Sequence, residues 1–139
     1  MDLKYYVDTS IWRDYYENRV DKFRPLGEWA FQFLLCIKLE RNIILYSDLV
    51  INELLKRYNN KEIKNIFKII SKHNLLKKVK INDFEIKESH ELSKKLKIPF
   101  GDCLHAILAR NNNAIIITRD KHFFELQQIV SFNTPEELI

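Results

Sequence analysis

Residues 98–120 read IPFGDCLHAILARNNNAIIITRD and contain a helix, a turn and a strand in one short stretch. The sequence predicts an apolar helix that begins near Asp102, an Asn-Asn-Asn turn and a wholly apolar strand over residues 114–118. A strand without polar alternation is typical of a parallel sheet that helices cover on both faces. Ligands of such sheets bind beyond the carboxyl ends of the strands. Asp120 follows this strand, so it lies where a functional site is expected.

The composition is that of one globular domain, which we expect to span residues 1–139. The chain is 46% hydrophobic and 12% aromatic, and its length allows a sizeable core. The amino-terminal residues are charged and predict a strand rather than a signal peptide, and no apolar run is long enough to cross a membrane. We therefore expect a soluble, cytoplasmic protein. Cys36 and Cys103 lack CxxC spacing and lie in apolar helical patterns, which predicts buried free thiols rather than a zinc site.

Positive charge is concentrated in the middle of the chain. Residues 56–97 hold 13 Lys or Arg and 5 Asp or Glu, a net +8, while the whole chain carries +4. A basic region combined with a separate acidic pocket suits an enzyme that binds nucleic acid and a divalent metal ion. Lysine-rich helices that only keep the protein soluble account for the same distribution, so charge alone leaves both interpretations open.

Strands and helices alternate along the chain. Strands are predicted at residues 4–8, 43–47, 114–118 and 129–132, with a further short strand within the connection 74–81. Helices are predicted from residue 9 through 15 and at residues 26–40, 48–58, 61–73, 83–97, from 102, and at 122–128, with a last helical turn at 134–138. This alternation predicts an α/β sandwich around a mainly parallel sheet of four to five strands.

Four acids lie beside these predicted strands: Asp8, Glu53, Asp102 and Asp120. Parallel strands with helical crossovers bring the four acids to one edge of the sheet. Glu53 is the most informative of the four. At about 100° per residue along the predicted helix it points between Leu49 and Val50, and a buried, uncompensated charge is costly. Gathered carboxylates repel one another unless a cation is bound. Oxygen ligands without cysteine or paired histidine favour Mg²⁺, with Mn²⁺ as the second choice.

Each acid also has a purely structural interpretation. Asp8 and Asp120 are in positions typical of helix caps or turns, and Asp102 is typical of a first helical turn. Asp48 begins a helix, and capping is its better explanation. A lone histidine on an apolar helix is more often packed than catalytic, so we expect His105 to be a packed or supporting residue. His122 is predicted at the surface or at a helix start, with metal contact as the alternative.

The sequence resembles the PIN-domain ribonucleases, and among them the VapC-type toxins of toxin–antitoxin pairs. The resemblance rests on VDTSIW at 7–12, NELLKR at 52–57, IPFGDCLHAILA at 98–109 and ITRDKHF at 117–123, and it extends to residues 134–138. It implies a PIN-like three-layer α/β/α sandwich in which the four acids bind metal. Thr118 occupies a supporting hydroxyl position, and Thr9 or Ser10 assists from the first loop. His105 departs from the pattern, because an apolar residue is common there.

The resemblance also implies a function and partners. The expected activity is Mg²⁺-dependent endoribonuclease cleavage of single-stranded or looped RNA by a toxin that inhibits translation, acting as a homodimer and covered by a cognate antitoxin. Candidate phosphate-binding residues are Arg13, Lys94, Lys95, Lys97, Arg110 and Lys121. The alternatives are an RNA-processing PIN nuclease without an antitoxin and a non-catalytic RNA-binding or scaffolding PIN domain. A haloacid-dehalogenase-type phosphatase is disfavoured, because it needs an acid where Ser10 stands, and a receiver-like switch lacks its paired acid.

Overall fold

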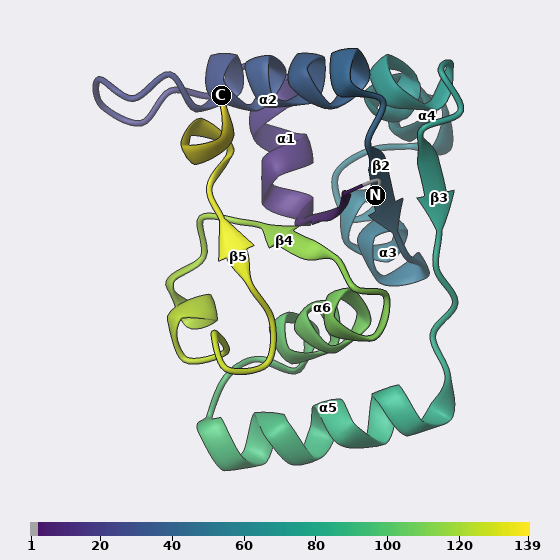
Figure 1. The fold of residues 1–139 in the computed structure, drawn as a ribbon, viewed down its shortest axis with the longest axis vertical. Helices are drawn as coiled ribbons and strands as arrows, with labels where there is room; N and C mark the ends of the chain where they lie inside the picture. The colour runs from purple at the N-terminus through teal and green to yellow at the C-terminus, as the bar shows by residue number, and fades with distance from the viewer. Residues whose placement is uncertain (1–2) are drawn as a thin grey trace.

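A five-stranded parallel sheet forms the centre of the computed structural model, which describes residues 3–139 (Figure 1). All neighbouring strands pair in parallel, in the order β3-β2-β1-β4-β5. The strands are β1 (Lys4–Val7), β2 (Ile43–Tyr46), β3 (Leu76–Lys78), β4 (Ile115–Ile117) and β5 (Phe132–Asn133). The predicted α/β fold with a parallel sheet is confirmed.

Helices cover both faces of this sheet. They are α1 (Thr9–Glu17), α2 (Leu26–Glu40), α3 (Asp48–Leu55), α4 (Asn60–Ser71), α5 (Asp83–Leu96) and α6 (Phe100–Asn111), with 3₁₀ helices η1 (Lys121–Phe124) and η2 (Pro135–Leu138). Figure 1 shows α1, α2 and α4 on one side of the sheet and α6 on the other, with α5 outside α6. None of the helices among residues 3–139 has the length and apolar character needed to cross a bilayer.

Alternate side chains of β1 enter the two helical layers. Tyr5 packs edge-on against Phe33 of α2, with ring centroids 5.5 Å apart, whereas Tyr6 faces His105 of α6. Both tyrosines are buried. Because successive strand residues point to opposite faces, a strand covered on both sides must be apolar throughout. This requirement explains why β1 and β4 lack polar alternation.

Several predicted boundaries differ from the observed ones. Helix α3 ends at Leu55 rather than at residue 58, since Asn59 forms a capping box with Glu62 that starts α4. The predicted helix 122–128 is only the short η1. The last strand is β5 rather than residues 129–132, because the backbone N–H groups of Ile129 and Val130 donate to the Leu126 carbonyl in a turn. Local hydrogen bonding therefore replaces regular structure after η1.

Gly27 allows α1 and α2 to approach closely. A Cβ atom at this position would lie 2.4 Å from the Cα of Asn18 and 2.6 Å from the carbonyl oxygen of Asp14. The Gly27 N–H also donates to the Arg19 carbonyl at 2.9 Å. A side chain of any size would separate these backbones, so the crossing requires glycine.

The order of the strands identifies the edge at which a ligand is expected. The chain passes from β1 to β2 and β3 in one direction and then returns to place β4 on the other side of β1. Open parallel sheets bind ligands at such a switch point, beyond the carboxyl ends of the two strands that flank it. Asp8 follows β1 directly and Asp120 follows β4, so both acids lie at this point.

Candidate metal centre

The four candidate acids surround one cavity at the carboxyl ends of β1 and β4. Asp8 follows β1, Glu53 lies on α3, Asp102 is in the first turn of α6, and Asp120 caps η1. The cavity has a volume of about 510 Å³. It is lined by Asp8, Thr9, Ser10, Arg13, Glu53, Lys56, Arg57, Asp102, Arg119 and Asp120. Residues from both halves of the chain therefore form one site.

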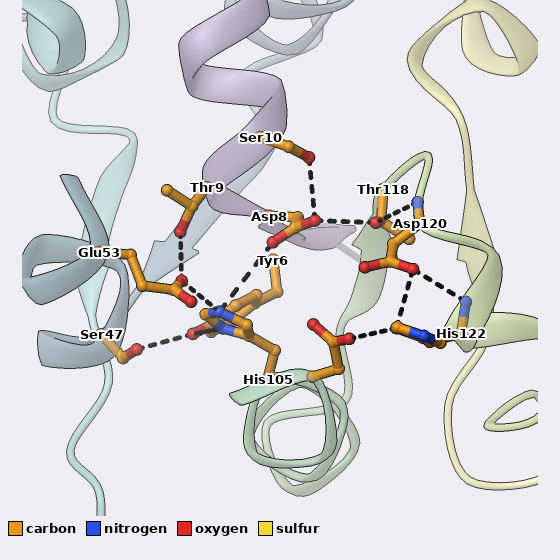
Figure 2. Close-up of polar contacts among 11 residues, drawn as sticks. Tyr6, Asp8, Thr9, Ser10, Ser47, Glu53, His105, Thr118, Asp120 and His122 are labelled. Carbon is orange, nitrogen blue, oxygen red and sulfur yellow. Dashed lines mark hydrogen bonds and ion pairs between the residues drawn. The ribbon is translucent and has the colours of Figure 1, made fainter. Parts of the chain in front are cut away.

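Asp8 is a buried carboxylate held by two hydroxyl groups (Figure 2). Its Oδ2 accepts hydrogen bonds from Ser10 Oγ at 3.0 Å and from Thr118 Oγ1 at 2.9 Å. Thr118 Oγ1 in turn accepts the backbone N–H of Asp120 at 3.0 Å, which links the ends of β1 and β4. Burial raises the pKa of Asp8, although the nearby His105 and the two hydroxyls oppose the increase. Asp8 is therefore a carboxylate that gains from a bound cation.

Glu53 is held through a single oxygen. Its Oε1 accepts a hydrogen bond from Thr9 Oγ1 at 2.6 Å and lies 2.7 Å from Nε2 of His105. Burial alone would raise the pKa of Glu53, but the hydrogen bond and charge of His105 and the Thr9 hydroxyl lower it below its ordinary value. Its side chain is 31% exposed, so Glu53 reaches the cavity rather than the apolar core. The apolar neighbours of Glu53 on the predicted helix indicated that its side chain points inward. Its hydrogen-bond partners, Thr9 and His105, lie on other elements.

His122 connects the other two acids. Its Nδ1 lies 2.7 Å from Asp102 Oδ2 and 3.1 Å from Asp120 Oδ1, and its backbone N–H donates to Asp120 Oδ1 at 2.9 Å. The hydrogen bond to Asp102 raises the pKa of His122, whereas burial raises the pKa of Asp102 against the influence of His122. The sequence predicted that His122 lies at the surface or at a helix start, with metal contact as the alternative, and His122 lies at the start of η1. The signal in the sequence was the position of His122 two residues after Asp120, the acid that caps η1.

Each of the four acids leaves one oxygen without a hydrogen bond from residues 3–139. These oxygens are Asp8 Oδ1, Glu53 Oε2, Asp102 Oδ1 and Asp120 Oδ2. The acids fall into two groups, each with a histidine, whose candidate ligand atoms lie within 4.8 Å of one another. Figure 2 shows Asp8, Glu53 and Asp120 around a common space. Oxygen donors with one free atom each fit a hard divalent cation such as Mg²⁺ or Mn²⁺.

The cationic side chains at the cavity differ from most of those that the sequence suggested. Arg13 lines the cavity as proposed, and Lys56 and Arg57 join it at the end of α3. The sequence hypothesis did not include these two, although they lie three and four residues after Glu53, in the turn that directly follows α3. Arg119 also lines the cavity, but its guanidinium is held by Glu136 at 2.7 Å.

The remaining suggested cations lie elsewhere. Arg110 is at the opposite end of α6 from Asp102 and forms two contacts of 2.7 Å with Glu88. Lys121 is exposed in η1 beside Asp120, outside the cavity lining. The other three suggested cations lie at the end of α5, the outermost helix in Figure 1: Lys94, Lys95 and Lys97.

Comparisons with known proteins agree with this fold. The PIN domain family profile matches residues 5–128, and the chain belongs to this family. No match was found among curated protein sequences.

Three solved structures show the shared fold. VapBC2 from Rickettsia felis, bound to a DNA fragment from its promoter, contains a chain with a TM-score of 0.68 and 18% identity, covering 95% of this chain and 98% of that one. A toxin–antitoxin complex from Klebsiella pneumoniae contains a chain with a TM-score of 0.61 and 20% identity, covering 94% of this chain and 96% of that one. FitAcB from Neisseria gonorrhoeae contains a chain with a TM-score of 0.59 and 17% identity, covering 94% of this chain and 97% of that one.

Proposed function

We propose that this single-domain protein is a divalent-metal-dependent endoribonuclease and the toxin of a toxin–antitoxin pair. One observation carries the proposal: four acids of a PIN domain, each with one oxygen that accepts no hydrogen bond from residues 3–139, line a cavity that arginine and lysine side chains also line. Acids without a hydrogen-bond donor on one oxygen suit a metal ion, and the neighbouring cations suit phosphate groups.

The residues divide into metal-holding and phosphate-holding groups. Asp8, Glu53, Asp102 and Asp120 would hold Mg²⁺ or Mn²⁺. When bound, such an ion activates water for in-line attack and neutralises charge on the scissile phosphate. The hydroxyls of Thr9, Ser10 and Thr118 fix the acids, and Arg13, Lys56 and Arg57 would bind the flanking phosphates.

Single-stranded or looped RNA is the substrate class that we propose. Asp8, at the floor of the cavity, is only 8% exposed, so a phosphate must enter the cavity to approach it. An unpaired strand can bend its backbone into such a recess, whereas a regular duplex holds its phosphates along a rigid surface. Cleavage of exposed loops in a cellular RNA is consistent with inhibition of translation.

The proposed partners are an antitoxin and a second copy of the chain, in the cytoplasm. The similar solved structures include toxin–antitoxin complexes, which supports a cognate antitoxin. A processing nuclease without an antitoxin would use the same acids. A non-catalytic scaffolding domain has no need of four acids with unpaired oxygens, so the geometry favours an enzyme.

The decisive test is RNA cleavage with matched acid variants. The full chain is incubated with structured RNA and with single-stranded DNA, in Mg²⁺, in Mn²⁺ and in chelator. We expect RNA cleavage by the wild type in either metal, and none by Asp8→Asn or Asp102→Asn. Asp48→Asn is the control, because Asp48 is exposed and pairs with Lys78 away from the cavity. Cleavage that persists in chelator or in both variants would refute the proposal.

A second experiment separates a toxin from a processing nuclease. Expression of the wild type in a bacterial host should arrest growth, and Asp8→Asn should not. Relief of the arrest by a small protein encoded beside this gene would support the antitoxin. Active cleavage without growth arrest would favour the processing nuclease.

A further inference from the structure

A buried chain of hydrogen bonds leads from Glu53 into the interior of the protein, and its histidine also lies 4.0 Å from Asp8 Oδ1 (Figure 2). The His105 ring contacts Glu53 Oε1 through Nε2 at 2.7 Å and the Tyr6 hydroxyl through Nδ1 at 2.8 Å. The Tyr6 hydroxyl lies 2.7 Å from Ser47 Oγ. His105 is 1% exposed, and Tyr6 and Ser47 are 0% exposed. The chain therefore runs from the sheet to Glu53 without contact with solvent.

The members of this chain come from three elements and from the junction between β2 and α3. Tyr6 lies in β1, Ser47 follows β2, His105 is in the middle of α6, and Glu53 is on α3. Ser47 occupies the N-cap of α3, yet its side chain caps no helix N–H and contacts Tyr6 instead. A common capping interaction is absent at this residue, and a hydroxyl-to-hydroxyl contact takes its place.

The chain determines which oxygen of Glu53 remains available. An ionised carboxylate only accepts hydrogen bonds, so Nε2 of His105 must carry a proton toward Oε1. The contact at Nδ1 keeps the ring from turning, because rotation would break the bond to Tyr6. Thr9 donates to the same Oε1. With two donors on Oε1, Oε2 is left to face the cavity.

We propose that His105 is a positioning residue, held by Tyr6 and Ser47, that orients Glu53 so that Oε2 presents to the metal ion. The inference rests on the proposed metal centre and adds a specific role to a residue that does not itself line the cavity. Groups that hydrogen-bond to metal ligands fix ligand orientation, and their loss typically lowers metal affinity by about 10- to 100-fold.

A packing role alone predicts something different. A buried polar network is costly unless all its members are paired, so an apolar side chain of similar size would be the simpler way to fill this space. If His105 only packs, removing the Tyr6 hydroxyl or replacing the imidazole with an apolar side chain of similar size should leave metal affinity unchanged. If His105 positions Glu53, metal affinity should follow the hydrogen bonds.

Mn²⁺ binding by the full chain distinguishes the two roles. Isothermal titration calorimetry and the electron paramagnetic resonance signal of bound Mn²⁺ are measured for wild type, His105→Leu, His105→Gln and Tyr6→Phe. We expect His105→Leu to weaken Mn²⁺ binding by about 10- to 100-fold. His105→Gln should recover much of the loss, since its amide can donate to Oε1, and Tyr6→Phe should weaken binding several-fold.

Tyr5→Phe is the matched control. Tyr5 is the adjacent residue of β1, and its ring packs against Phe33 on the opposite face of the sheet. We expect its Mn²⁺ affinity and resonance signal to equal those of the wild type. Should His105→Leu fail to fold, Tyr6→Phe decides the question.

The outcomes separate this role from the proposed function. Wild-type affinity and an unchanged signal in Tyr6→Phe, with no loss in a folded His105→Leu, would overturn the positioning role and leave the metal centre intact. A wild type that binds no Mn²⁺, like Asp8→Asn, would overturn the metal centre itself and the positioning role with it.

Discussion

Asp102→Asn should make the metal-free protein more stable while removing its response to metal. Burial raises the pKa of Asp102, and the nearby Asp120 raises it further against the opposing effect of His122. The ionised carboxylate at neutral pH is therefore unfavourable in the folded state, and an uncharged side chain of the same size removes that cost. Asparagine keeps an oxygen that accepts the hydrogen bond from His122.

The size of the effect follows from two opposing contributions. Candidate ligand atoms of Asp102 and Asp120 lie within 4.8 Å of each other. At that separation and an effective dielectric constant of about 20, two negative charges repel by about 3 kcal/mol. Replacing the charged acceptor of the His122 hydrogen bond loses about 1–2 kcal/mol. We expect a net gain of about 1 kcal/mol, which raises the melting temperature by about 2–5 °C.

Thermal and urea unfolding in chelator and in Mn²⁺ test this reasoning. The wild type should gain about 2.7 kcal/mol when Mn²⁺ is 100-fold above its dissociation constant, and Asp102→Asn should gain little. Asp48→Asn is the control, since Asp48 lies outside the cavity and pairs with Lys78. A variant that is less stable than wild type in chelator, yet keeps the full Mn²⁺ increment, would contradict the electrostatic account.

Three further predictions concern the frame and the rim of the cavity. Gly27→Ala should lower the free energy of unfolding by about 1–3 kcal/mol in urea, because its Cβ meets backbone atoms, and an unchanged value would disprove the close crossing. Burial would raise the pKa of Glu136, but Arg119 lowers it below the ordinary value. The contribution of the Arg119–Glu136 pair to the free energy of unfolding is therefore complete above about pH 4.5 and is lost as pH falls through the folded-state pKa of Glu136. Glu136→Gln should therefore flatten the acid limb of the stability curve, and an unaltered limb would count against the pair. Lys56→Ala with Arg57→Ala should weaken single-stranded RNA binding and reduce the slope of log affinity against log salt by about 1.4, whereas an unchanged slope would exclude phosphate contacts.

Arg110→Ala is the matched control for the rim variants. Arg110 is engaged with Glu88 at the far end of α6, so the loss of its charge should leave the salt dependence of RNA binding unchanged. A reduced salt slope in this variant would place the RNA path along α6 instead.

Local patterns in the sequence were enough to predict the parallel sheet and the edge at which the acids meet. The apolar run before Thr118 has no polar alternation, which only a strand covered on both faces requires. Asp8 and Asp120 each follow such a strand, and right-handed helical crossovers place strand ends together. These are local patterns of spacing and residue type, so they can be recognised before the chain is folded.

The side chains that hold the acids, and the oxygens that stay free, depend on tertiary packing. His105 meets Glu53 across 52 residues, and Thr118 meets Asp8 across 110. No local period encodes such contacts, because they depend on how α3, α6 and the sheet pack. The same holds for His122, whose ring reaches Asp102 only through the turn after β4. Sequence patterns place an acid at an edge, but only packing around it selects the donor for one oxygen and leaves the other for a ligand.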